Sequence, residues 1–319
     1  MTEFKQYIAE EIAIDHADGM FGRREAMRRL GLLGLSATAA TAVLAACSTD
    51  SSDSATASAT SSDTASGNAS AATPNAAGTS SSLTAGAPGM STAVATAPIT
   101  FAGPSGTLQG AFAAAADPRG AVLVIHENKG LTDHIRTIAG RLAGAGYSSL
   151  AIDLLSEEGG TGTFADPARA TAALGNVPQA RFVADMKAGI AELAQRVPGK
   201  KIGVIGFCFG GGQVWSLLAS GDTDIAAAVP FYGPLPEGAN FAGSKQAAVL
   251  AIYAGLDQRV NASRPQAEAA LKAAGLVNQI ETVPDVDHAF FNDTGTRYKP
   301  EAAAKVYGQV LDWFGRYLG

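Results

Sequence analysis

Charged residues, histidines and cysteines are all scarce in this 319-residue chain. Asp, Glu, Lys and Arg together make up 16% of it, and the net charge is −6. Proteins that bind a phosphate backbone carry an excess of Lys and Arg, so this composition argues against nucleic-acid binding. Hydrophobic residues make up 47%, which suits a soluble globular protein.

A long apolar run is also lacking where a membrane anchor would be expected. Residues 30–46 are apolar but short and diluted with Gly, Ser and Thr, so they make a poor permanent membrane span. Arg23 and Arg24 precede this stretch and resemble a twin-arginine export signal. It ends in Leu44-Ala45-Ala46-Cys47, which resembles a bacterial lipobox, where a diacylglycerol is attached to the cysteine and the chain is cleaved before it.

We therefore expect residues 1–47 to be an export signal that ends in the lipidation site Cys47. Two acyl chains are enough for stable anchoring, so the protein would be held at the cell envelope through this lipid only. The alternative is an uncleaved amphipathic helix with a chance cysteine. Residues 48–97 are almost wholly small and polar, which predicts a disordered linker with a reach of roughly 40 Å.

Residues 98–319 have the pattern of a single α/β domain. Short apolar strands alternate with amphipathic helices after an opening hairpin, which predicts a mostly parallel sheet with helices on both faces. The expected strands are 97–103, 107–114, 121–126, 148–155, 201–207, 224–233, 247–255 and 278–283. The expected helices are 134–147, 180–197, a helix from about 209 to 220, 263–275 and 300–318.

Cys208 lies in Gly206-Phe207-Cys208-Phe209-Gly210, a pattern in which serine esterases have Ser at the centre. The two glycines allow a sharp turn between a strand and a helix, which would expose the central side chain. A thiol at a helix N-terminus ionises more easily than a free thiol, and the thiolate is a good nucleophile. The alternative is a small buried cysteine at a strand end.

Asp257 and His288 follow Cys208 in the chain order nucleophile, acid, histidine that α/β-hydrolases use. Each lies in a loop just after a predicted strand, where parallel sheets place their sites. His126 also ends a strand and competes for the role of base, whereas His134 is expected to be a surface residue or a helix cap. For Asp257 the alternative is a turn-capping aspartate.

With these residues placed, the folded domain resembles the dienelactone hydrolase family. The resemblance rests on the Cys208 turn, on HENKGL at residues 126–131, on AIDLL at 151–155, on the Asp257 loop and on HAFFND at 288–293. It implies an α/β-hydrolase with a Cys-Asp-His triad, active on lactone or ester bonds. It also implies a role for Glu127, which would contact the resting thiol; the alternative is a salt bridge with Lys129 or Arg136.

The expected reaction is therefore acyl transfer to water through a thioester on Cys208. The oxyanion would be held by the backbone N–H groups of Phe209 and Asn128. No metal or other cofactor is expected, since HENKG is not an HExxH motif. The family holds a substrate carboxylate with arginines, but Asn292 stands at one such position and Arg169 and Arg181 are only near the other. A dicarboxylate-type lactone is therefore not the expected substrate.

The sequence is also consistent with other functions and with another state of the two cysteines. The same scaffold fits a general exported esterase that acts on surface or polymeric acyl groups. A tethered binding protein without turnover is an alternative of another class, although no triad residue is missing. A disulfide between Cys47 and Cys208 is a third possibility. The expected partner is a small ester or lactone, and the expected state is a monomer.

Overall fold

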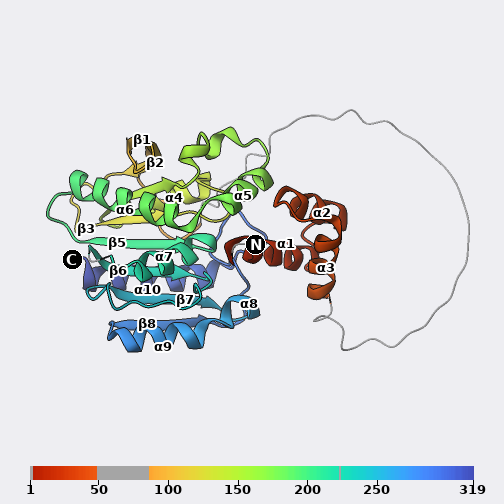
Figure 1. Ribbon diagram of the computed structural model, residues 1–319. Coiled ribbons are helices and arrows are strands. Elements are labelled where there is room, and N and C mark those ends of the chain that lie inside the picture. Colours follow the sequence, from red (N-terminus) through yellow and green to blue (C-terminus); the bar gives the residue numbers. More distant parts are fainter. Residues whose placement is uncertain (1–2, 49–85, 223) are drawn as a thin grey trace, which may run out of the picture. The chain divides into compact units, whose positions relative to one another are not determined.

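The computed structural model describes residues 3–48, 86–222 and 224–319 (Figure 1). The chain forms two compact units, one of residues 1–8 with 83–319 and the other of residues 9–82. Most of the predicted linker, residues 49–85, lies outside the described residues. The boundaries expected at residues 47 and 97 therefore stay predictions.

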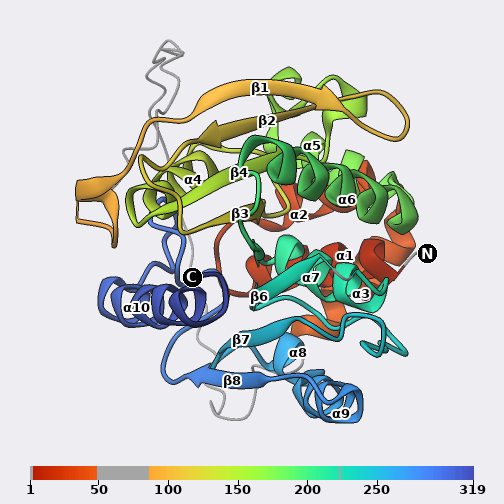
Figure 2. The ribbon, with the colours of Figure 1, turned by 90° about the vertical axis from the view of Figure 1, so that its left-hand side faces the viewer.

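The larger unit is built on an eight-stranded sheet in the order β1-β2-β4-β3-β5-β6-β7-β8, which Figure 2 shows from one edge to the other. From β4 to β8 every neighbouring pair is parallel, whereas β1 pairs with β2 and β2 with β4 in antiparallel fashion. The strands are β1 Ala97–Ala102, β2 Thr107–Ala113, β3 Gly120–Ile125, β4 Tyr147–Asp153, β5 Ile202–Phe207, β6 Ile225–Phe231, β7 Ala248–Ala254 and β8 Asn278–Val283. This confirms the mostly parallel sheet and the opening hairpin.

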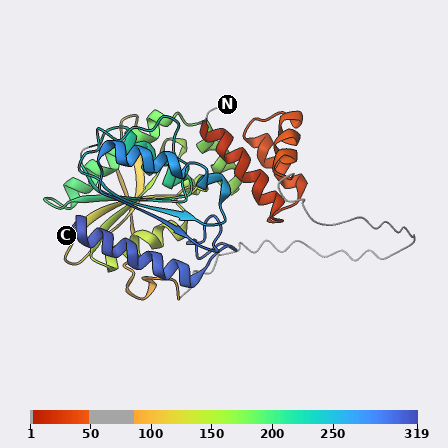
Figure 3. The same cartoon turned by 90° about the horizontal axis from the view of Figure 1, so that it is seen from below.

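Helices cover both faces of the sheet, as unbroken apolar strands require. α4 and α10 pack on one face, and α6, α7 and α9 lie on the other (Figures 2 and 3). Their bounds are α4 Asp133–Gly144, α5 Pro167–Asn176, α6 Gln179–Arg196, α7 Phe209–Ala219, α8 Gln258–Asn261, α9 Arg264–Ala274 and α10 Pro300–Tyr317. The short helices α5 and α8 were not expected from the sequence. Three-residue 3-10 turns occur at Met90–Thr92, Ser156–Glu158 and Thr161–Thr163.

The central strands are buried on both faces. Every residue of β3, β4, β5 and β7 is buried, because helices cover both sides of these strands. The edge strands β1 and β8 and the second strand β2 are partly exposed, and β6 has one half-buried residue. The parallel strands all end at the same edge of the sheet, so the loops after β3, β5, β6, β7 and β8 meet there.

The smaller unit is helical where the structure describes it. It contains most of α1 (Glu3–Ala17), together with α2 (Arg23–Leu32) and α3 (Ala37–Ser48), and α2 packs against α3. Arg23 and Arg24 are exposed at the start of α2. The neighbouring Glu25 bonds to Arg28 and Arg29, which lowers the pKa of its carboxyl to about 2. Among the described residues, no helix has the length and apolar character needed to cross a membrane.

Candidate active site

Cys208 sits in the tight turn that the sequence predicted, directly between β5 and α7. Its backbone has φ 57° and ψ −117°, a left-handed conformation that is costly for a residue with a side chain. Its N–H donates to the carbonyl of Phe231 at the end of β6 (3.0 Å). The flanking glycines are required by space: a Cβ on Gly206 would lie 2.2 Å from the carbonyl oxygen of Gly210, and a Cβ on Gly210 2.4 Å from that of Ile125.

Asp257 and His288 come together from the ends of β7 and β8. Oδ2 of Asp257 accepts a hydrogen bond from Nδ1 of His288 at 2.6 Å, and Oδ1 accepts from the N–H of Val260 at 3.1 Å. Asp257 is therefore both the cap of α8 and the partner of the histidine. A ring nitrogen of His288 lies within 4.8 Å of Sγ of Cys208. The structure thus brings together the three side chains expected to form the triad.

The charges at this site favour an ionised His288. Burial acts to lower the pKa of His288, but the negative charges of Cys208 and Asp257 outweigh it, and the pKa lies well above its usual value. Burial acts to raise the pKa of Asp257, and the imidazolium of His288 outweighs that effect and lowers it. All three side chains are less than one-tenth exposed, so water screens these interactions weakly.

Glu127 follows β3 and faces the loop after β8. Its Oε2 accepts a hydrogen bond from Nδ2 of Asn292 at 2.6 Å, whereas Arg136 pairs with Asp133 instead. Oε1 of Glu127 is buried and has no hydrogen-bond partner in the part of the chain that the structure describes. Among the described residues, the salt bridge with Lys129 or Arg136 that the sequence left open is therefore not formed, and Asn292 holds this carboxylate.

The two residues expected to form the oxyanion hole lie at the same edge of the sheet. Phe209 is the first residue of α7, and the first N–H groups of a helix have no carbonyl acceptor within it. Asn128 directly follows Glu127 in the loop after β3, and its carbonyl accepts from Oγ1 of Thr171 at 2.9 Å. Cys47 lies in the last turn of α3, and the structure does not describe its side chain, so lipidation and the disulfide alternative stay predictions.

The two other histidines of the larger unit have structural surroundings. His126 is fully buried, its Nε2 accepts from the N–H of Leu154 at 3.1 Å, and its Nδ1 contacts the carbonyl of Glu127 at 2.7 Å. Burial also lowers its pKa. With both ring nitrogens held by backbone groups, His126 is a poor candidate for the base, which leaves His288.

His134 was expected at the surface or at a helix cap, and this expectation was wrong. Its side chain is 2% exposed, and Nδ1 lies 2.5 Å from Oδ1 of Asp293. Nη2 of Arg141, also on α4, donates to Oδ2 of Asp293 at 2.7 Å. Both partners lower the pKa of Asp293 although burial opposes them. This buried cluster ties α4 to the loop that carries His288 and Asn292.

We expect Asp293→Asn to lower both stability and turnover. The substitution leaves the fully buried guanidinium of Arg141 without its counter-charge, which typically costs about 3–5 kcal/mol. It also loosens the loop that places His288. Urea unfolding and kcat for an aryl ester measure the two effects.

The double variant Arg141→Leu with Asp293→Leu is the control, because it removes both charges together. It should recover much of the stability but not the loop position, and hence not the full kcat. A single variant as stable and active as the parent would contradict the assignment of this cluster.

Two residues that lie near the thiol were not predicted from the sequence. The hydroxyl of Tyr7 lies 3.5 Å from Sγ of Cys208, and Tyr7 is held by Arg259, whose guanidinium carbon lies 4.0 Å from its ring centre. Tyr232, just after β6, has φ 35°, and its ring centroid lies 5.0 Å from that of His288. Burial raises the pKa of Tyr232 well above its usual value, and the charges of Glu127 and Cys208 add to the shift. For Tyr232, the one sequence feature that could have indicated the site is its position at the end of a predicted strand.

The sheet, its two helix layers and the tight turn between β5 and α7 define an α/β-hydrolase. The dienelactone hydrolase family profile matches residues 108–318, about two thirds of the chain. The chain therefore belongs to the dienelactone hydrolase family and is a carboxymethylenebutenolidase-like hydrolase.

Individual relatives agree with this placement. A candidate carboxymethylenebutenolidase of Escherichia coli O157:H7 is 34% identical over 215 residues, which covers 63% of this chain and 79% of the relative. The structure of a candidate dienelactone hydrolase from Klebsiella pneumoniae is 28% identical with a TM-score of 0.61, over 70% of this chain and all of that chain. A dienelactone hydrolase-like promiscuous phosphotriesterase from metagenomic libraries is 26% identical with a TM-score of 0.63, over 71% of this chain and all of that chain.

Proposed function

We propose that this protein hydrolyses an uncharged carboxylic ester or lactone, with Cys208 as nucleophile, His288 as acid and base, and Asp257 as the group that orients His288. The observation that carries the proposal is the meeting of these three side chains at one edge of the sheet. The Asp257–His288 hydrogen bond of 2.6 Å and the nearness of His288 to Sγ supply the geometry that the reaction needs.

In the first half-reaction, the thiolate of Cys208 attacks the carbonyl carbon and forms a carbon–sulfur bond. The carbonyl oxygen takes up the negative charge and accepts hydrogen bonds from the N–H groups of Phe209 and Asn128. Losing one such donor typically costs about 2.7–4 kcal/mol of transition-state stabilisation. The carbon–oxygen bond then breaks, and the imidazolium of His288 gives its proton to the departing alkoxide.

In the second half-reaction, neutral His288 takes a proton from water as the water oxygen attacks the thioester carbon. The carbon–sulfur bond breaks, and the carboxylic acid leaves. Sulfur regains its electron pair, which restores the ion pair between the Cys208 thiolate and the His288 imidazolium. Asp257 keeps Nδ1 of His288 protonated throughout, so that the other ring nitrogen serves the reaction.

The surroundings of the thiol favour an uncharged substrate. Arg181, an arginine near the expected carboxylate site, is already paired with Glu158 (2.6 Å) and Glu157 (3.3 Å). Asn292, the other position, is a neutral amide bonded to Glu127. A substrate carboxylate would therefore find Arg181 already paired and a neutral amide at 292, while Arg169 is exposed on α5. A general esterase acting on exported or polymeric acyl groups is the second candidate, favoured by the predicted export signal.

We expect Asn292→Arg to leave hydrolysis of a neutral aryl ester within about fivefold of the parent, because this residue does not touch the triad. The same change should raise kcat/KM for a lactone that carries a carboxylate, by about 10-fold, because a charge-assisted hydrogen bond becomes available. Steady-state kinetics on the two substrates measure both effects. Asn292→Gln is the matched neutral control, and an equal gain from that variant would rule out the charge explanation.

A panel of neutral lactones, linear esters and carboxylate-bearing lactones tests the proposal directly. Hydrolysis of neutral substrates with burst release of the alcohol is the expected result. Binding without turnover would favour the tethered binding protein instead, and a preference for carboxylate-bearing lactones would overturn the neutral-substrate assignment. Rapid thiol labelling at neutral pH is a second check, since a thiolate reacts quickly.

We also propose that the protein is exported and anchored at the cell envelope by lipid on Cys47. Exposed Arg23 and Arg24 and the Leu44–Cys47 sequence support this proposal. Mass spectrometry of the purified protein should find a chain that begins at diacylated Cys47. An intact N-terminus would contradict the proposal, and a Cys47–Cys208 disulfide would contradict both the anchor and the nucleophile.

A further inference from the structure

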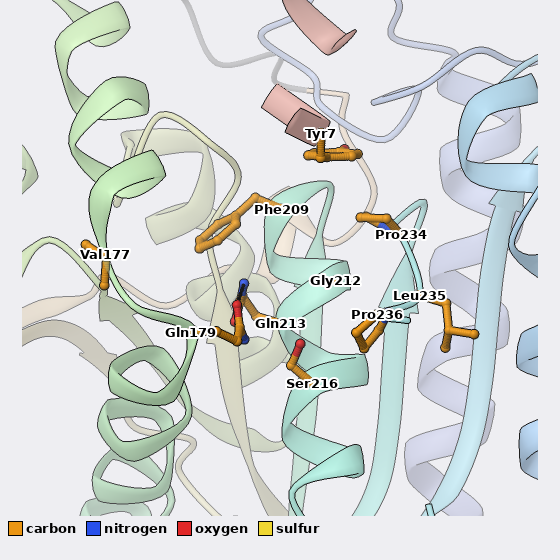
Figure 4. Close-up of a pocket in the computed structure, with 10 residues that line it drawn as sticks. All are labelled: Tyr7, Val177, Gln179, Phe209, Gly212, Gln213, Ser216, Pro234, Leu235 and Pro236. Atoms are coloured by element: carbon orange, nitrogen blue, oxygen red, sulfur yellow. Dashed lines mark hydrogen bonds between the residues drawn. The ribbon is translucent and has the colours of Figure 1, made fainter. Parts of the chain in front are cut away.

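A mainly apolar pocket runs along α7 from Phe209, the residue that follows Cys208 (Figure 4). One wall is the face of α7 that starts at Phe209 and continues through Gly212 and Gln213 to Ser216, since residues three and four apart share a helix face. The ten residues that line it are Tyr7, Val177, Gln179, Phe209, Gly212, Gln213, Ser216, Pro234, Leu235 and Pro236. Its volume is about 160 Å³, enough for a short alkyl chain but not for a bulky polycyclic group.

The pocket opens next to the thiol. Phe209, which lines the pocket, directly follows Cys208. In the full chain Tyr7, which Figure 4 places at the Phe209 end, has its hydroxyl 3.5 Å from Sγ. Cleavage before Cys47 would remove Tyr7 and leave the other nine lining residues in place. From there the pocket follows α7 to Ser216, seven residues on, which is about 10 Å along a helix. A group bonded to Sγ would therefore have this pocket as its neighbour.

The lining carries no full charge. Lys, Arg, His, Asp and Glu are all absent from these ten residues. The two amides face each other: Nε2 of Gln179 donates to Oε1 of Gln213 at 2.6 Å, and Nε2 of Gln213 donates back at 3.2 Å. Because the two amides are hydrogen-bonded to each other, neither needs a polar ligand as a hydrogen-bond partner. A carboxylate placed here would lose its hydration and gain no cation.

We infer that this pocket binds the acyl chain of the substrate and selects an uncharged, unbranched alkyl chain of short to medium length. The inference rests on the proposed function, because it needs Cys208 to carry the acyl group. The acyl side is preferred to the alcohol side since the acyl group stays bonded to sulfur between the two half-reactions. A pocket beside Sγ can hold the acyl group for as long as it is bonded to sulfur, whereas the alcohol has to leave the site.

Aryl esters of acetate, butyrate, hexanoate and octanoate test this inference on the full chain. The parent kcat/KM should rise by roughly fourfold per methylene until the pocket is filled. Ser216→Phe fills the far end, so it should lower the ratio of kcat/KM for octanoate to kcat/KM for acetate by about 10-fold. Leu235→Ala enlarges the pocket from another wall and should shift the preferred chain to greater length.

Ser220→Phe is the matched control, because it makes the same change at the exposed C-cap of α7, outside the lining. A parent that hydrolyses all four esters without chain-length dependence would overturn the pocket inference and leave the proposed function standing. Dependence on the alkyl length of the alcohol, at constant acyl group, would overturn the acyl assignment. Hydrolysis of none of the four would count against the proposed function itself.

Discussion

Cys208→Ala is expected to abolish ester hydrolysis, by a factor of about 10⁶ when the nucleophile of a triad is removed. The alanine has no atom that can form the thioester, although it keeps the Cβ and hence the same backbone preferences as cysteine at φ 57°. The fold and the neighbouring pocket should therefore be retained. Initial rates with an aryl ester measure the loss, and an unchanged melting temperature verifies the fold.

Two companions make the Cys208 result specific. Cys208→Ser keeps the shape of the side chain but offers a hydroxyl, which must lose its proton during attack. Its rate should therefore fall between the rates of the parent and of Cys208→Ala. Trapping of the acyl-enzyme should give a mass increase on the parent and none on the alanine variant. Turnover by Cys208→Ala at the parent rate would exclude Cys208 as nucleophile.

Asp257→Asn should lower kcat by roughly 10²- to 10⁴-fold near neutral pH. The carboxylate holds Nδ1 of His288 at 2.6 Å and raises its pKa, whereas an amide carries no charge and can favour the wrong tautomer. With that charge removed, the pKa of His288 falls. The imidazolium needed to protonate the alkoxide is then lost at lower pH, so the basic limb of the kcat/KM profile should move to lower pH.

The control for Asp257 separates orientation from capping. Asn caps helices about as well as Asp, so the bond from the N–H of Val260 should survive in Asp257→Asn and stability should change little. Asp285→Asn changes an exposed aspartate near His288 and should leave kcat unaltered. A pH profile that Asp257→Asn does not shift would contradict the orienting role.

Much of the fold could be predicted because each central strand is a short apolar run that can be recognised in the local sequence. Apolar runs such as 121–126 and 202–207 are buried on both sides and fall between helices with a clear apolar face. The turn at Cys208 was predictable as well, because only glycine fits at 206 and 210. The chain order of Cys208, Asp257 and His288 then pointed to three loops at one edge of the sheet.

The rest depends on contacts between residues far apart in the chain. Nothing near His134 indicates that Asp293, 159 positions later, will bury it, and a histidine in the first turn of a helix is more often exposed. Tyr7 and Cys208 are separated by 201 positions, and Tyr232 has a backbone conformation that its residue type does not favour. Short helices such as α8 carry too few residues to show a periodic pattern.

The left-handed backbone at Cys208 has a thermodynamic consequence. Any L-amino acid there costs the folded state of order 1–3 kcal/mol relative to a relaxed conformation, and glycine would relieve most of that cost. The same backbone presents whatever side chain stands at 208 in the same place, so sulfur and oxygen can be exchanged without rebuilding the turn. Glycine at 208 would therefore make the fold more stable but would leave no reactive group there. Keeping a reactive side chain at this position lowers the stability of the folded state.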